Sequence, residues 1–188
     1  MYERLKEMVA KLAGGGEERR HAHALYVAIA EAARRPEFYA RWRVPDTTEG
    51  RYELLSVHMI LTLRRLRAGG DATARFSQLL FDVMFRDVDD TLREMGVGDM
   101  RVGKKVRGYA EAFLGRAGAY DLGLDREADL KEAIARNVYG DLDEPFAQAL
   151  ADYMYMTEDA LQKQALEALL GGTISFPEPS FEERSDDD

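Results

Sequence analysis

Four aspartates crowd the stretch FDVMFRDVDDTLREMGVG, residues 81–98, and carboxylates are ligands that divalent cations favour. They are Asp82, Asp87, Asp89 and Asp90. A motif that bridges metal ions on a helix needs carboxylates about one turn apart, yet Arg93 occupies the fourth position after Asp89. A metal-dependent all-α enzyme using these aspartates is therefore the alternative hypothesis, which bound Mg²⁺ or an open carboxylate-lined pocket would favour.

Other arrangements that support catalysis or cofactor binding are incomplete. The chain has no cysteine, which excludes disulfides, zinc knuckles and a thiol nucleophile. A ferritin-like iron site needs paired Glu-x-x-His motifs, and only Glu18 and His21 supply one copy. The glycines at 14–16 precede two glutamates, which would repel a phosphate. We therefore expect a protein that is not an enzyme and that has no metal or cofactor site.

The aspartates belong to a segment, about residues 72–95, with the apolar periodicity of an amphipathic helix. Its apolar residues recur at steps of three and four: Phe76, Leu79, Leu80, Val83, Met84, Val88 and Met95. On the polar side, charges of opposite sign lie about one turn apart, which predicts a ladder of ion pairs. Asp87 falls on the dry face, so we predict that His58 or Arg51 is its partner. The predicted structural signature comprises His58, Asp82, Arg86, Asp87, Asp89, Arg93 and Glu94.

A second segment, about residues 48–67, is apolar on almost every side. Its middle part, LLSVHMILTL, contains no full charge, and ten residues span only about 15 Å as a helix, half of a bilayer core. The pattern predicts a buried central helix packed on the 72–95 helix, with Asp46 or Thr47 as its cap. His58 lies within it, where a hydrogen-bonded core histidine is the usual outcome. The predicted fold is all-α, a single compact multi-helix domain.

The rest of the chain divides into a body and two tails. Residues 1–16 form a short helix and a glycine linker, because three consecutive glycines disfavour a helix. Docking on the body and lying on a membrane surface are both open for that helix. The body, residues 17–172, holds further helices over about 17–34, 100–114 and 124–139, the last opened by Asp125. A final helix from Glu144–Pro145 to Gly171 is expected to kink near Thr157. The acidic tail, residues 173–188, is predicted to be disordered or a loose strap.

Charge is unevenly distributed along the chain. Residues 1–107 carry 20 Lys and Arg against 16 Asp and Glu, whereas residues 108–188 carry 6 against 19, within a total of −9. The basic half could lie near RNA or anionic lipid, or its arginines could simply solvate helix faces. The densest positive patch is Arg101, Lys104, Lys105 and Arg107.

Three motifs together resemble the ubiquinol-cytochrome c chaperone family of assembly factors. They are ARRPEFYARWRVPDT (33–47), GRYELLSVHMILTLRRLR (50–67) and FDVMFRDVDDTLREMGVGDMRVGK (81–104). The resemblance covers roughly residues 24–170. It implies a non-enzymatic, all-helical chaperone that binds newly made cytochrome b and promotes assembly of the ubiquinol-cytochrome c reductase. The ribosome and an anionic membrane surface are further partners in this reading, and DNA is not; whether a small partner protein is needed is left open, as is the oligomeric state.

A chaperone needs an apolar, adaptable client surface, and methionine and aromatic side chains suit it. The predicted client-binding residues are Tyr153, Met154, Tyr155, Met156, Phe38, Tyr39 and Trp42. The competing reading places part of the 153–156 turn in the core. The basic patch would face ribosomal RNA or anionic lipid. The chain begins without the apolar core of a secretory signal, so we expect a cytoplasmic protein, peripheral to the inner membrane.

Overall fold

The computed structural model describes residues 2–179, with side chains from residue 15 onward. Helices account for nearly all the regular structure of that range, and it contains no strand. The elements are α1 (Tyr2–Ala33), α2 (Pro36–Ala40), α3 (Thr48–Arg67), α4 (Asp71–Glu94), α5 (Asp99–Leu124), α6 (Leu130–Ile134), a π-helical turn (Ala135–Tyr139), α7 (Phe146–Gln162) and α8 (Leu166–Leu170). The all-α prediction is confirmed.

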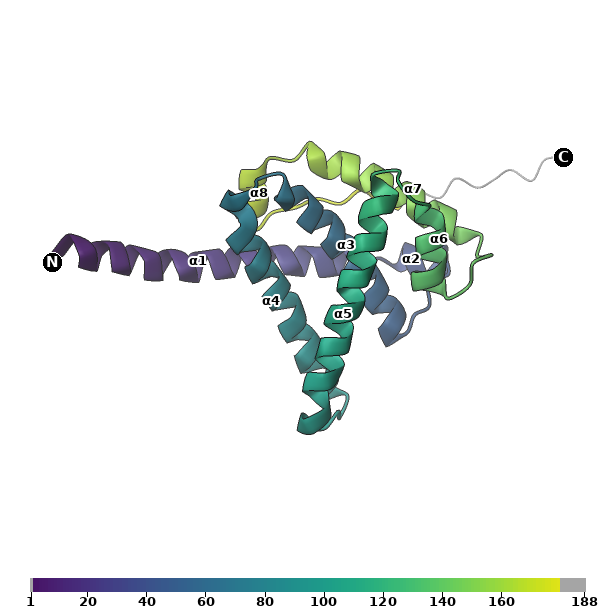
Figure 1. The fold of residues 1–188 in the computed structure, drawn as a ribbon, viewed down its shortest axis with the longest axis horizontal. Helices are drawn as coiled ribbons and strands as arrows, with labels where there is room; N and C mark the ends of the chain where they lie inside the picture. The colour runs from purple at the N-terminus through teal and green to yellow at the C-terminus, as the bar shows by residue number, and fades with distance from the viewer. Residues whose placement is uncertain (1, 180–188) are drawn as a thin grey trace.

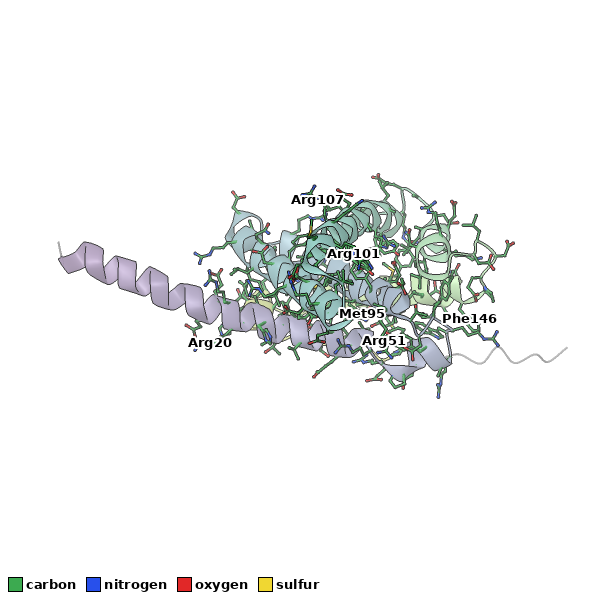
Figure 2. All side chains as sticks on the ribbon, turned by 90° about the horizontal axis from the view of Figure 1, so that it is seen from below. Arg20, Arg51, Met95, Arg101, Arg107 and Phe146 are labelled. Atoms are coloured by element: carbon green, nitrogen blue, oxygen red, sulfur yellow. The ribbon has the colours of Figure 1, made fainter. Side chains whose placement is uncertain are left out.

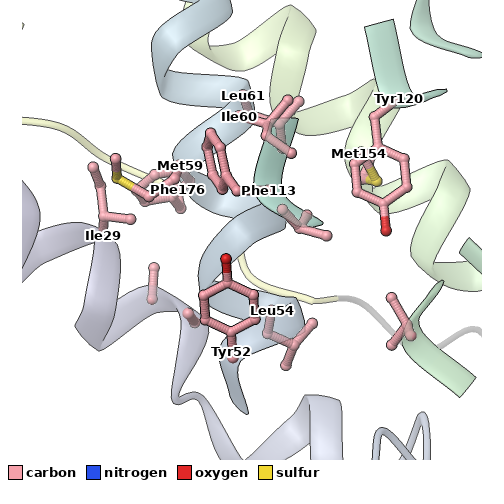
Figure 3. Close-up of a cluster of buried hydrophobic side chains, with 14 of the residues drawn as sticks. Ile29, Tyr52, Leu54, Met59, Ile60, Leu61, Phe113, Tyr120, Met154 and Phe176 are labelled. Carbon is pink, nitrogen blue, oxygen red and sulfur yellow. The ribbon is translucent and has the colours of Figure 1, made fainter. Parts of the chain in front are cut away.

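Helix α3 is the centre of the molecule. It contacts α1, α4, α5, α7, α8 and the π-helical turn, and it lies among them in Figure 1. Every residue from Tyr52 to Thr62 except Leu55 is buried, as the uncharged sequence predicted. Thr47 begins the helix by accepting a hydrogen bond from the Gly50 amide at 3.1 Å, because the first amides of a helix have no partner within it. Figure 3 shows apolar side chains from several elements meeting beside α3, among them Ile29, Phe113 and Met154.

Helix α1 does not break at the glycines. It runs through Gly14, Gly15 and Gly16, so the predicted linker between residues 1–16 and the body is wrong. A glycine costs about 1 kcal/mol relative to alanine inside a helix, and the Ala, Leu, Lys and Glu residues on either side favour helix strongly enough to offset it. The C-terminal part of α1 packs on α3, α4 and α8, and the N-terminal part extends beyond the other helices in Figure 1.

Helices α4 and α5 form an antiparallel arm that projects from the body (Figure 1). The chain reverses at Gly96, whose φ of 79° is a backbone conformation that favours glycine. The Phe81 ring lies 4.5 Å from the Phe85 ring and 5.7 Å from the Phe113 ring, so aromatic contacts join the two helices. Helix α5 continues to Leu124, ten residues beyond the predicted end at Leu114, because Gly115 and Gly118 do not terminate it.

Two later helix boundaries also differ from the prediction. Asp125 ends α5, and Asp129 opens the next helix by accepting a hydrogen bond from the Glu132 amide at 3.2 Å. Thr157 is buried within an uninterrupted α7, and the break comes after Gln162. Arg65 stabilises the chain at this break, since its guanidinium donates hydrogen bonds to the carbonyls of Leu161 and Gln164 at 2.9 and 2.7 Å.

The segment from Thr173 to Pro179 lies against the body. Phe176 is buried, and its ring lies 5.0 Å from the His58 ring. Arg35 donates to the carbonyls of Phe176 and Pro177, and Gln164 exchanges two hydrogen bonds with the backbone of Ser175. Of the two alternatives, residues 173–179 therefore form a strap along the body and not a disordered tail, and residues 180–188 lie outside the described range.

Candidate functional site

A cleft of about 250 Å³ opens where α1, α3, α4 and α5 meet. Its floor is apolar, and the buried side chains there are Ala30, Ala33, Tyr52, Val88 and Leu92. Its rim is polar, and the exposed residues there are Arg34, Thr48, Arg51 and Thr91. A second hollow shares Arg34 and Arg51 and continues past Pro36, Tyr39 and Ala40. We call the two hollows together the groove; Arg34 and Arg51 line both of them, Asp87 lines the first and Asp46 lines the second.

Asp87 lines this cleft, and its partner comes from α1. The Tyr26 hydroxyl donates to Asp87 Oδ2 at 2.6 Å, so the predicted pairing with His58 or Arg51 is wrong. Arg51 instead pairs with Asp46, its Nε 2.7 Å from Oδ1. Burial, reinforced by the hydrogen bond to the carboxylate, raises the pKa of Tyr26, so the hydroxyl stays protonated and can donate. The contact ties α1 to α4 at the wall of the cleft.

His58 is a buried core residue. Nδ1 donates to the Leu54 carbonyl at 2.8 Å, which leaves Nε2 to accept from the Tyr153 hydroxyl at 2.9 Å. Burial lowers the pKa of His58 to about 4, so the ring is neutral at pH 7. The histidine therefore joins α3 to α7.

The predicted ladder of charges on α4 is largely absent. Arg93 binds Asp89 at 2.5 Å and also Asp99, whereas Asp82 accepts from the Gln78 side chain at 2.7 Å. Arg86, Asp90 and Glu94 are exposed, and among residues 15–179 they form no ion pair. Exposed pairs one turn apart contribute only about 0.3–0.5 kcal/mol, too little to hold long side chains in register. Nowhere in the described range do three His, Asp or Glu residues cluster as metal ligands would.

Most of the predicted client-binding aromatics are in the core. Phe38, Trp42, Tyr153 and Met154 are all at least 98% buried. The Phe38 ring lies edge-on to those of Trp42 and Tyr153, with centroids 5.3 and 5.1 Å away. They cannot contact a client in this conformation, because α7 packs on both α3 and α6 and two of its faces are covered.

The remaining three of that set lie nearer the surface. Tyr39 is half-buried, lines the second hollow and donates to the Ala33 carbonyl at 2.8 Å. Tyr155 is half-buried and donates to the Gly123 carbonyl at 2.9 Å, and Met156 is 39% exposed. The structure thus brings only Tyr39 to the groove.

The four cations of the predicted basic patch lie on the surface. Arg101, Lys104, Lys105 and Arg107 are exposed on the first turns of α5, and none of them forms an ion pair within the part of the chain that the structure describes. Two large apolar residues, Met95 and Met100, are exposed beside it. The α4 periodicity placed Met95 in the core, which is wrong because α4 ends at Glu94, at the tip of the arm.

The sequence analysis did not predict two ionic contacts, one with a buried carboxylate and one partly exposed cluster. Arg116 on α5 makes a two-point contact with Glu53 on α3, with both N–O distances 2.5 Å. Burial raises the pKa of Glu53, and the guanidinium opposes this rise. On the same two helices, Arg64 binds Asp121 and Asp125, and it also binds Glu158 on α7. In each contact the arginine and its carboxylates lie far apart in the sequence, so no local pattern could predict them.

The described residues form an all-α body with a cleft at the junction of α1, α3, α4 and α5. A sequence profile of the ubiquinol-cytochrome C chaperone family matches residues 40–176, and the chain belongs to this family. It is similar to the crystal structure of the Cbp3 homolog from Brucella abortus, with 37% identity over 95% of this chain and 98% of the other, and a TM-score of 0.79. Comparison with curated proteins gives no match.

Hydropathy adds one further fact about the described helices. None combines the length and the apolar character required to span a bilayer.

Proposed function

We propose that this chain is a non-enzymatic assembly chaperone that binds newly synthesised cytochrome b and promotes assembly of the ubiquinol-cytochrome c reductase. The observation that carries the proposal is the family match over residues 40–176. The contacts of α4 support it, because Asp82 and Asp87 accept hydrogen bonds from Gln78 and Tyr26, and Asp89 pairs with Arg93.

The groove at the α1–α3–α4–α5 junction is the proposed client site. Its floor of Tyr52, Val88 and Leu92 would accept a few apolar side chains of a client segment. Arg34 at the edge favours a segment with an acidic group beside the apolar ones, whereas Arg51 is already paired with Asp46. Of the residues predicted from sequence, Tyr39 belongs to this site, whereas Tyr155 and Met156 remain candidates for a separate contact.

The proposed location is the cytoplasm, at the periphery of the inner membrane. The four exposed cations at the start of α5 support it, because they match an anionic surface such as lipid headgroups or ribosomal RNA.

Two substitutions at neighbouring positions of α4 test the client site. Thr91 is exposed and lines the cleft, whereas Asp90 is exposed and does not line it. Thr91→Trp should fill the cleft, and Asp90→Trp is the matched control. In a strain that lacks the native protein, the absorbance of haem b in the reductase should be restored by the control and reduced severalfold with Thr91→Trp. Equal restoration by both variants would rule out the cleft as the client site, and undiminished reductase in the deletion strain would refute the proposed function.

A further inference from the structure

The tip of the α4–α5 arm exposes two large apolar side chains. Met95 is 59% exposed and Met100 is 98% exposed, although methionine is usually buried. The arm projects from the body in Figure 1, so its tip can reach a flat surface before the rest of the molecule does. Exposed methionines at the end of a projecting hairpin indicate a contact that the isolated protein does not satisfy.

Four cations follow the two methionines, on the first turns of α5. Arg101, Lys104 and Lys105 follow Met100 at steps that place them on adjoining faces of the first two turns of α5, and Arg107 lies one turn further on. Figure 2, which views the molecule from below, labels Met95, Arg101 and Arg107 on the side of the molecule toward which the arm projects.

The acidic groups around the tip weaken this positive charge only in part. Asp99 is the one acid within residues 99–107, and Arg93 binds both Asp99 and Asp89. Asp90 and Glu94 are exposed on the last turns of α4, next to Met95, and they lower the positive charge on that side of the tip. The α5 side of the tip therefore presents four cations and no free acid within the first nine residues of that helix.

We propose that the tip of the α4–α5 arm docks on an anionic lipid bilayer, with Met95 and Met100 inserted among the headgroups and the α5 cations bound to lipid phosphates. Apolar side chains flanked by Lys and Arg are the pattern of proteins that rest on a membrane interface. RNA is the poorer match, because residues 95–107 contain no aromatic side chain for base stacking and an exposed methionine gains little against a phosphate backbone. The inference rests on the peripheral location proposed above and is independent of the client.

A fluorescent label at the tip tests this docking directly. Because the chain has no cysteine, Met100→Cys offers a unique site for an environment-sensitive probe such as NBD. Vesicles of phosphatidylcholine mixed with phosphatidylglycerol should shift the emission to the blue and increase its intensity, whereas pure phosphatidylcholine should not. The control is Leu142→Cys, 59% exposed in the loop before α7, where the emission should stay unchanged.

Two variants separate the apolar and ionic contributions in vesicle sedimentation. Met95→Ser with Met100→Ser, and Lys104→Glu with Lys105→Glu, should each weaken binding to anionic vesicles by about tenfold or more. These positions are exposed, so the melting temperature should not change. If the protein sediments with anionic vesicles while the label at position 100 remains in water, the arm is not the docking element. If it binds poly(U) RNA but no vesicle, the surface serves RNA instead, and the Thr91→Trp test of the client site is unaffected by either result.

Discussion

Acid should destabilise this protein through one buried histidine. His58 has no exposed surface, and the rings of Phe38 and Phe176 lie 5.5 and 5.0 Å from its own. Its Nε2 accepts from Tyr153 and its Nδ1 donates to Leu54, an arrangement that requires the neutral ring. A second proton would place an uncompensated charge in the core and end the hydrogen bond that Nε2 accepts.

The size of this effect follows from the pKa of the ring. Burial lowers the pKa of His58 from 6.5 to about 4. Between those pH values the unfolded chain binds a proton that the folded protein does not, so the free energy of unfolding falls as the pH is lowered through this window. At about 1.4 kcal/mol per pH unit, the full loss is on the order of 3 kcal/mol. Above pH 6.5 the histidine contributes no pH dependence.

Urea denaturation of wild type and His58→Gln at pH 7.5 and pH 4.5 measures this contribution. Carboxylates also titrate in this range, so the relevant quantity is the difference between the two proteins in their loss of stability. We expect His58→Gln to lose about 2–3 kcal/mol less than wild type on acidification. His23→Gln, at an exposed position, should behave as wild type. An equal loss for His58→Gln and wild type would refute the reasoning.

Three further substitutions test contacts that define the fold. Tyr26→Phe removes the hydrogen bond to Asp87 and should lower the free energy of unfolding in urea by about 1–2 kcal/mol; unchanged stability would mean that the contact does not join α1 to α4. Arg116→Met leaves the buried Glu53 carboxylate unpaired and should cost about 3 kcal/mol, part of which Glu53→Gln should restore in the double variant. Phe176→Ala should cost about 3 kcal/mol and lower the melting temperature, whereas an unaltered melting temperature would show that the C-terminal segment adds no stability.

The central helix pair could be predicted because its signal is local. An uncharged run of ten residues has to be buried, and α3 is. The four-residue spacing of Phe76, Leu80, Met84 and Val88 marks one helix face, and all four are buried in α4. For these two helices, the residues that form the sequence pattern are the same residues that pack in the core.

The proposed client site could not be predicted because it depends on which helices become neighbours. By residue type alone, Tyr153 and Met156 are equally suited to a client surface. The helices that pack on α7 bury Tyr153 and leave Met156 exposed. The cleft combines residues of four helices, and the partner of Asp87 lies 61 positions away. At the tip, the periodicity of α4 wrongly placed Met95 on the buried face. A spacing pattern does not show where α4 ends or which helices cover it.

The central claim is that the groove holds newly made cytochrome b, and site-specific crosslinking in living cells tests it most directly. A photo-crosslinking amino acid at position 91 would lie in the cleft, and the same residue at position 90 would lie outside it. After a short pulse of labelled amino acids and illumination, we predict a crosslink from position 91 to cytochrome b and none from position 90. Cytochrome b captured equally from both positions, or from neither while the reductase still depends on the protein, would contradict the claim.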